Sequence, residues 1–408
     1  MNPPPLQTYD TRRMRSLSQR RRRHAITTAV TAGVLIAGAA GVSVWAIARP
    51  THAIRPVAAA PAAPVAAQAT PTATTPAPAA PTTATPDRTR PATITISAVG
   101  DMIFDRQVRA LISKSGGSAP LARVADHLSR ADITVGNLES SLSDEGTRNA
   151  DKDVTLHGDP RGIEGLKIAG FDFVSMANNH VLDFGPLPML DTIATLDSAG
   201  IGHAGAGANK AAAWEPATAT RRGAKVAYLA FGHIVPAGFI ARDDRPGMAS
   251  GKWDMSLVRD AIREAKRHNN YVLVSFHWGV EYTDNPLAEQ VTNAHLAIDA
   301  GADMVLAHHP HVIQSVEYYK GRLIAYSLGD FVFDHYSRKT GEAFILDAEL
   351  GPDGVANARA VPVYLDGYGR PEIVTGSEAT AILTRLKNIS GPRRTTVAIS
   401  DNTARILP

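Results

Sequence analysis

The stretch 271-YVLVSFHWGVEYTDNPLAEQVTNAHLAIDAGADMVLAHHPH-311 decides the fold class of this chain. It opens and closes with short, apolar, β-branched runs, 271–276 and 303–307, that predict buried strands. The segment between them has helical periodicity, and one apolar face is formed by Leu287, Val291, Ala294 and Ile298. A strand, a helix and a second strand in this order predict a parallel pair joined by a right-handed crossover.

The helix of this unit should have recognisable ends. Asn285 is expected to cap it, Pro286 to occupy its first position and Gly301 to end it. Short apolar runs and longer amphipathic segments alternate on both sides of the unit, which predicts an α/β fold with much parallel pairing. The further strands are expected at 93–99, 133–135, 171–176, 225–231 and 323–327, and the further helices at 120–129, 186–199 and 254–268.

Polar side chains follow these strands at the points where the strands end. In open α/β sheets the carboxyl ends of the strands form the edge at which ligands bind, so the position of these side chains suggests a common site. The residues concerned are Asp101; Asn137 and Glu139; Asn178, Asn179, His180 and Asp183; His277; and His308, His309 and His311.

Most of these residues, taken singly, have a structural explanation. Asp101 could form a turn or cap a helix, His180 could be a satisfied, partly buried histidine, and Asn178 and Asn179 could be turn residues. Three histidines within residues 308–311 are harder to explain by packing alone. Imidazole and carboxylate groups in a chain without cysteine favour a divalent transition metal, Zn, Mn or Fe, held without thiolates.

At this point the sequence resembles a known family. The motifs Gly100-Asp101, Asn137-Leu138-Glu139-Ser140, Ala177-Asn178-Asn179-His180, His277-Trp278-Gly279-Val280-Glu281-Tyr282, His309-Pro310-His311-Val312-Ile313-Gln314 and Ser327-Leu328-Gly329 are similar to those of CapA/PgsA-type proteins of capsule and poly-γ-glutamate biosynthesis. These proteins belong to the calcineurin-like metallophosphatase superfamily. The resemblance implies a four-layer αββα sandwich over residues 93–340, with 341–408 as a C-terminal extension of the same domain whose role the sequence leaves open.

The resemblance also implies a site with one or two divalent metal ions. Asp101 and His311 would hold the first ion, Glu139 would bridge, and Asn179, His277 and His309 would hold the second. His180, steadied by Asp183, would be the general acid or an electrostatic stabiliser. The expected substrate contacts are Glu281, Tyr282 and Asn137, although Glu281 and Tyr282 could equally be ordinary loop residues.

Two positions depart from the family pattern. The superfamily's first motif is Asp-x-His, whereas this chain has Asp101-Met102-Ile103, so one ligand of the first ion is missing. The first ion site is therefore expected to be weak, and a single bound ion is an alternative. Asp330 stands where the family more often has asparagine, and we expect it to cap a turn rather than to adjust the site.

Charge is distributed unevenly along the chain. Of the 42 Lys and Arg and 39 Asp and Glu, 11 arginines and only two aspartates lie before residue 92. The remaining 31 basic and 37 acidic residues leave the domain without the positive surplus that binding to nucleic acid requires. We therefore expect no nucleic-acid partner.

The N-terminal part predicts a membrane anchor. Residues 1–24 form a basic tail with seven arginines, and 25–48 are an uncharged run of 24 residues, long enough to span a bilayer as a helix. The positive-inside rule places the N-terminus in the cytoplasm and the main domain outside the cytoplasmic membrane. A cleaved signal peptide is the alternative, but the run is long for one. Residues 49–92, rich in Pro, Ala and Thr, predict an extended, disordered linker.

Three functions remain open from the sequence. The first is a membrane-anchored, metal-dependent, hydrolase-like factor in the synthesis, release or attachment of capsule or poly-γ-glutamate. Its expected partners are an extracellular anionic polymer or its precursor, and membrane synthase subunits. The second is a non-catalytic subunit that binds polymer or acts as a scaffold for the synthase. The third is a generic extracytoplasmic metallophosphodiesterase.

Overall fold

The computed structural model describes residues 90–408. The predicted basic tail, the predicted transmembrane helix and nearly all of the predicted linker lie outside these residues. Within 90–408, no helix combines the length and the apolar character needed to cross a bilayer. The described residues 90–408 belong to one compact unit.

The larger sheet is built around β1. This strand pairs in parallel with β2 and β15 and antiparallel with β16. The order is β19-β20-β17-β16-β1-β2-β5-β6, with β15 on β1 and β18 on β17. The strands are β1 (Ile94–Met102), β2 (Ile133–Leu138), β5 (Phe173–Ser175), β6 (Gly202–Ala204), β15 (Asp330–Val332), β16 (Glu342–Gly351), β17 (Gly354–Leu365), β18 (Pro371–Ile373), β19 (Thr396–Ser400) and β20 (Thr403–Leu407).

The smaller sheet has the order β13-β14-β12-β11-β9-β8. Its four central strands are parallel, and its two edge strands are antiparallel to their neighbours. The predicted α/β fold with much parallel pairing is therefore confirmed. The strands are β8 (Ala217–Arg221), β9 (Ala224–Gly232), β11 (Tyr271–His277), β12 (Met304–His308), β13 (Val316–Tyr319) and β14 (Arg322–Ala325).

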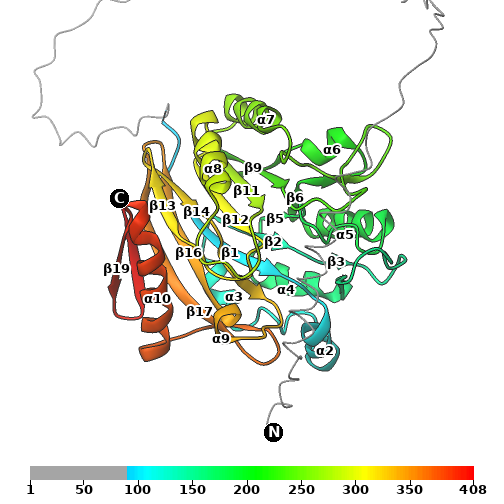
Figure 1. Ribbon diagram of the computed structural model, residues 1–408, viewed down its shortest axis with the longest axis horizontal. Coiled ribbons are helices and arrows are strands. Elements are labelled where there is room, and N and C mark those ends of the chain that lie inside the picture. The colour runs from blue at the N-terminus through cyan, green and yellow to red at the C-terminus, as the bar shows by residue number, and fades with distance from the viewer. Residues whose placement is uncertain (1–89) are drawn as a thin grey trace, which may run out of the picture. The chain divides into compact units, whose positions relative to one another are not determined.

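The two sheets share one apolar core, and each has a second core on its other face. Ile96 of β1 and Leu273 of β11 belong to the shared cluster, whereas Val272 and Val274 of β11 belong to the cluster on the outer face. This alternation is the strand period of two, which buries both faces of a central strand. The outer clusters include residues of α2 (Arg106–Ser115), α3 (Ala125–Leu128), α4 (Ile163–Ile168) and α5 (Pro186–Ala199) on the larger sheet, and of α6 (Lys210–Trp214), α7 (Met255–His268) and α8 (Ala288–Ala300) on the smaller one (Figure 1).

Two helix predictions need correction. α8 begins at Ala288 rather than at Pro286, because the backbone N–H of Leu287 donates to the Gln290 side chain at 2.8 Å and so caps the helix two residues later than expected. It ends at Gly301 as predicted, with a φ of 119°. Of the predicted helix 120–129 only α3 forms; the preceding residues make turns with bonds to the third residue back, for example from Leu121 to Ser118 and from Val124 to Leu121.

The C-terminal residues complete the larger sheet. β16 and β17 are its longest pair, and β16 pairs directly with β1. Helix α10 (Gly376–Ser390) contacts β17 and β19 of the larger sheet and β13 of the smaller one. Its residues Ile382, Leu383 and Leu386 belong to the shared core, so α10 closes one side of the space between the sheets (red, at the left of Figure 1).

The remaining elements are short. Helix α9 (Arg338–Gly341) precedes β16. Two-residue strands pair between β3 (Ser141–Leu142) and β4 (His157–Gly158) and between β7 (Ala206–Gly207) and β10 (Gly247–Met248).

A glycine contact sets the end of β1. A Cβ placed on Gly100 would lie 1.8 Å from the backbone oxygen of Gly329, and that same oxygen accepts the N–H of Asp101 at 3.0 Å. We expect Gly100→Ala to lower the free energy of unfolding by about 3 kcal/mol, because backbone atoms must move apart. Urea denaturation checks this, with Gly367→Ala as the control, since a Cβ there meets nothing within 4 Å. Equal losses in the two variants would contradict the prediction.

Candidate metal centre

Strand ends from both sheets meet at one edge. Asp101 lies at the end of β1, Glu139 directly follows β2, His277 ends β11, and residues 309–311 follow β12. Three groups of side chains each offer ligand atoms that lie within 4.8 Å of one another. These groups are Glu139, His309 and His311; Asp101, Glu139 and His277; and Asp101, His311 and Asp330.

Three carboxylates are buried together in this cluster. Asp101 and Glu139 are completely buried, and Asp330 is 2% exposed. The Asn137 amide donates to Asp101 Oδ1 at 2.8 Å and to Glu139 Oε2 at 3.3 Å. Asn137 is itself completely buried. The structure therefore places Asn137 between the two acids, and its contact with substrate stays a prediction.

Glu139 Oε1 carries the most informative contacts. It is buried and has no hydrogen-bond partner. The Nε2 atoms of three histidines face it, at 3.7 Å for His277, 3.9 Å for His180 and 4.0 Å for His311. These distances are too long for hydrogen bonds. They suit atoms that share an ion, because two ligands about 2.0–2.2 Å from a metal lie roughly 3–4 Å apart.

The second group of predicted ligands is also assembled. His277 Nε2 lies 2.7 Å from Asn179 Oδ1, and the rings of His277 and His309 are 4.8 Å apart between centroids. His309 Nδ1 is buried and makes no hydrogen bond. Asn178, which the sequence left as a turn residue, is completely buried and donates to the Leu138 carbonyl at 2.8 Å. It thereby ties the loop after β5 to the end of β2.

His180 is held by its neighbours on the side away from the cluster. Its Nδ1 lies 2.6 Å from Asp183 Oδ2, as the predicted pairing of these two residues requires. Lys152 pairs with the other oxygen of Asp183 and donates to the backbone carbonyl of Asn179. Because Asp183 accepts the hydrogen bond from Nδ1 of His180, the other ring nitrogen, Nε2, is the one that faces Glu139. The sequence offered no signal for Lys152, which lies in a loop without periodicity.

The backbone is strained where the cluster is built. His309, His311 and Tyr282 have positive φ angles of 96°, 56° and 64°. Such conformations cost non-glycine residues about 1–3 kcal/mol each and concentrate at functional sites. Tyr282 is held there by a hydrogen bond from its N–H to the Pro310 carbonyl at 2.8 Å.

The expectation that Asp330 caps a turn is wrong. Asp330 is the first residue of β15, and its Oδ1 lies 2.8 Å from His311 Nδ1. The turn before it is made by Gly329, which has a φ of 78°. His308, which was not assigned a ligand role, also reaches the cluster, with its Nδ1 3.2 Å from Asp101 Oδ1.

The electrostatics of the cluster follow from its burial. Burial and the nearby Asp101 carboxylate raise the pKa of Glu139 well above its usual range. Burial also raises the pKa of Asp330 to about 7. Burial and the His311 ring lower the pKa of His309 to about 3, and burial likewise holds the pKa of His277 well below its usual value. A bound cation would stabilise the ionised form of these buried acids, and it would bind the neutral form of these buried imidazoles.

The loop after β11 reaches the surface beside the cluster, and we call this position the mouth of the site. The side chain of Tyr282 is 41% exposed, and its ring centroid lies 6.2 Å from that of His311. Glu281 beside it is exposed. Lys339 donates to the Tyr282 carbonyl at 3.1 Å and pairs with Asp284 at 2.8 Å. Glu281 and Tyr282 are thus exposed to solvent, and their contact with substrate stays a prediction.

The donor set fits divalent metal, apart from one position. Ile103 is completely buried in the apolar cluster on the outer face of the larger sheet, so it contributes nothing to the site. The remaining imidazole, carboxylate and amide donors suit Zn, Mn or Fe. Glu139 Oε1 and His309 Nδ1 are buried without a hydrogen-bond partner, and a bound cation would supply one to each.

Lys152 offers a test of the support around His180. We expect Lys152→Met to lower the free energy of unfolding by about 3 kcal/mol, because it leaves the buried Asp183 without its cation. Urea denaturation at pH 7 measures this, with the exposed Lys114→Met as the matched control. A change no larger than that of the control would show that Lys152 does not support Asp183.

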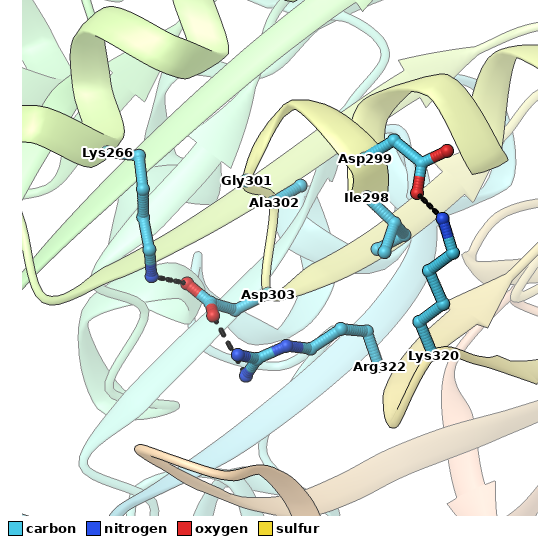
Figure 2. A pocket seen from close by; sticks show the side chains of 8 residues that line it. All are labelled: Lys266, Ile298, Asp299, Gly301, Ala302, Asp303, Lys320 and Arg322. Atoms are coloured by element: carbon cyan, nitrogen blue, oxygen red, sulfur yellow. Dashed lines mark hydrogen bonds and ion pairs between the residues drawn. The ribbon is translucent and has the colours of Figure 1, made fainter.

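The cavity in Figure 2 lies elsewhere. It sits at the amino-terminal ends of β12 and β14, opposite to the edge that carries the histidines. Its charges are paired: Asp303 binds Lys266 at 2.7 Å and Arg322 at 2.9 Å, and Asp299 binds Lys320. Asp303 also accepts the backbone N–H of Val272 at 2.7 Å. These contacts give the charged side chains around this cavity a structural role.

Comparison with known proteins gives a consistent result. The family model described as "Bacterial capsule synthesis protein PGA_cap" matches residues 95–335. The "Capsule biosynthesis protein CapA" of Bacillus anthracis is 33% identical over 289 residues, covering 70% of each chain. The "PGA biosynthesis protein CapA" of Bacillus subtilis is 31% identical over 276 residues, covering 66% of this chain and 71% of that one. A "probable polyglutamine synthesis accessory protein" of Mycobacterium tuberculosis is 34% identical over 235 residues, covering 54% of this chain and 60% of that one.

Proposed function

Because this chain belongs to the bacterial capsule synthesis protein family PGA_cap, we propose that it acts in making, releasing or attaching capsule or poly-γ-glutamate through a metal-dependent, hydrolase-like site. The observation that supports this most strongly is Glu139 Oε1, which is buried without a partner and faced by three imidazole Nε2 atoms. Buried carboxylate oxygens usually have a partner, and a bound cation would supply one here.

Each residue has a defined part in the proposed site. Asp101, Glu139 and His311 would hold one ion, and Glu139, Asn179, His277 and His309 the other. Divalent ions in such a site supply Lewis acidity and a water of lowered pKa. His180, oriented by Asp183 and Lys152, presents Nε2 to the same space. Tyr282 and Glu281 at the mouth would position the chain that is cut.

We place the domain outside the cytoplasmic membrane. The proposal rests on the apolar run 25–48, the seven arginines before it and the linker 49–92. The proposed partners are an extracellular anionic polymer or its precursor, membrane synthase subunits and the membrane itself. Protease added to intact cells or spheroplasts should digest the domain while a cytoplasmic marker survives, and a protected domain would contradict this placement.

A second candidate function is an accessory subunit without catalysis. The apolar Ile103 favours it, because one expected imidazole is replaced by a core residue. One relative also carries the word "accessory" in its name. A generic metallophosphodiesterase is the third candidate, and it predicts that deletion leaves the polymer unchanged.

Complementation separates these candidates. A deletion strain of the source organism is supplied with the wild-type chain or with His309→Ala, and polymer on the surface and in the medium is measured. We expect the wild type, but not the variant, to restore polymer, with both proteins present in equal amounts. Full restoration by His309→Ala would favour the accessory function, and an unchanged polymer in the deletion strain would favour the generic enzyme.

A further inference from the structure

Asp330 lies beside Asp101 on a neighbouring strand. β1 and β15 pair in parallel, and Asp101 and Asp330 are direct partners in that register. Partners in adjacent strands direct their side chains to the same face of a sheet. Asp330 Oδ1 lies 2.8 Å from His311 Nδ1, which is 3.8 Å from Asp101 Oδ2.

These three residues alone can form a ligand set. Asp101, His311 and Asp330 each offer one atom, and the three atoms lie within 4.8 Å of one another. Ile103 cannot take part, because its side chain is buried in an apolar cluster.

The cluster brings three buried carboxylates together. Asp101, Glu139 and Asp330 are all at least 98% buried. Among residues 90–408, their recorded ion-pair partners are histidines, and neither lysine nor arginine pairs with them. Buried carboxylates of this kind are stable when they coordinate a metal. The unpartnered Glu139 Oε1 is a separate indication that an ion belongs here.

We infer that Asp330 is a direct ligand of the first ion and takes the place of the imidazole that is absent at position 103. The inference rests on the metal site of the proposed function. It makes the first site richer in oxygen than a histidine-completed one. Carboxylate ligands suit Mn²⁺ better than softer ions, so the first site should favour manganese over zinc.

If Asp330 has only an indirect role, its replacement should cause a smaller loss of metal affinity. If Asp330 only oriented His311 through Nδ1, its loss would weaken binding of the ion by about 10–100-fold. Loss of a direct ligand should exceed about 100-fold, because it also removes a coordinating charge. Asp330→Ala tests for the larger loss, because alanine offers no atom to the ion, whereas the amide oxygen of an asparagine could still bind it, as that of Asn179 is proposed to do.

The experiment is a titration of the purified full chain with Mn²⁺. Calorimetry measures the affinity and number of the bound ions, and electron paramagnetic resonance measures whether they are coupled. We expect the wild type to bind about two ions that are magnetically coupled, and Asp330→Ala to bind about one uncoupled ion. Asp334→Ala is the matched control, because Asp334 pairs with Arg106 outside the cluster. The melting temperature in EDTA checks that each variant is folded.

Each outcome has one meaning. Two coupled ions in Asp330→Ala, or a loss of affinity below about 100-fold, would overturn the direct-ligand inference while leaving the metal site intact. No ion in the wild type would instead overturn the proposed function. If Asp330→Ala does not fold, Asp330→Glu replaces it; the displaced carboxylate should weaken binding of one ion at least about tenfold, and unchanged affinity would overturn the inference.

Discussion

Replacing Glu139 with glutamine is expected to abolish stabilisation of the protein by Mn²⁺ while leaving the metal-free protein at least as stable as the wild type. Glu139 is completely buried, and its Oε1 has no partner that a neutral amide would lose. A ligand at 100 times its dissociation constant adds about 2.7 kcal/mol of stability, and the variant should lose this gain. Thermal unfolding with EDTA and with Mn²⁺ measures both effects.

The raised pKa of Glu139 also predicts how the stability of the metal-free protein changes with pH. Burial raises the pKa of Glu139 above the ordinary value of 4.5, so the folded, metal-free protein binds a proton that the unfolded chain releases. The contribution of Glu139 to the stability should therefore fall as the pH rises above about 4.5, and Glu139→Gln, which has no carboxyl group to titrate at this position, should lack this contribution. A variant that is less stable than the wild type in EDTA, and that still gains stability from Mn²⁺, would contradict the account.

Replacing His180 with alanine is expected to lower kcat by about 100–10,000-fold while the number of bound ions stays the same. His180 Nε2 faces the cluster at 3.9 Å from Glu139, but Asp183 and Lys152 remain paired without the ring. The measurement is hydrolysis of a phosphodiester with a p-nitrophenyl leaving group and of one with an alkyl leaving group. A general acid is needed more by the alkyl ester, whereas an electrostatic stabiliser serves both esters equally.

Asp183→Asn is the companion variant for His180. It keeps a hydrogen-bond acceptor for Nδ1 but removes the charge, so a smaller loss of kcat is expected than for His180→Ala. Loss of a bound ion in His180→Ala would show that His180 is a ligand. A kcat within about threefold of the wild type would contradict its part in the reaction.

The fold was predictable where the signal is local. Residues 271–311 combine two buried strands with a helix of clear periodicity, and the structure has β11, α8 and β12 there. The start of α8 was missed because the cap depends on the Gln290 side chain. The pairing of β16 with β1 was not predictable either, because it joins residues about 250 positions apart and no local pattern encodes that register.

The site was predictable to the extent that it sits at strand ends. Asp101, Glu139, His277 and the histidines after β12 each follow a recognisable strand, and parallel strands bring their ends together. Asp330 was misjudged because an aspartate after Leu-Gly has the composition of a turn. Its role depends on a strand pairing with β1 that only the folded chain displays.

The central claim, that this edge of the sheets binds metal, is tested most directly by measuring the metal content of the purified protein by mass spectrometry. We expect about two equivalents of a divalent transition metal in the wild type and fewer in His309→Ala. The exposed His268→Ala is the control and should match the wild type. No bound metal in the wild type, even after reconstitution with Mn²⁺ or Zn²⁺, would contradict the account and leave an accessory, non-catalytic role as the better explanation.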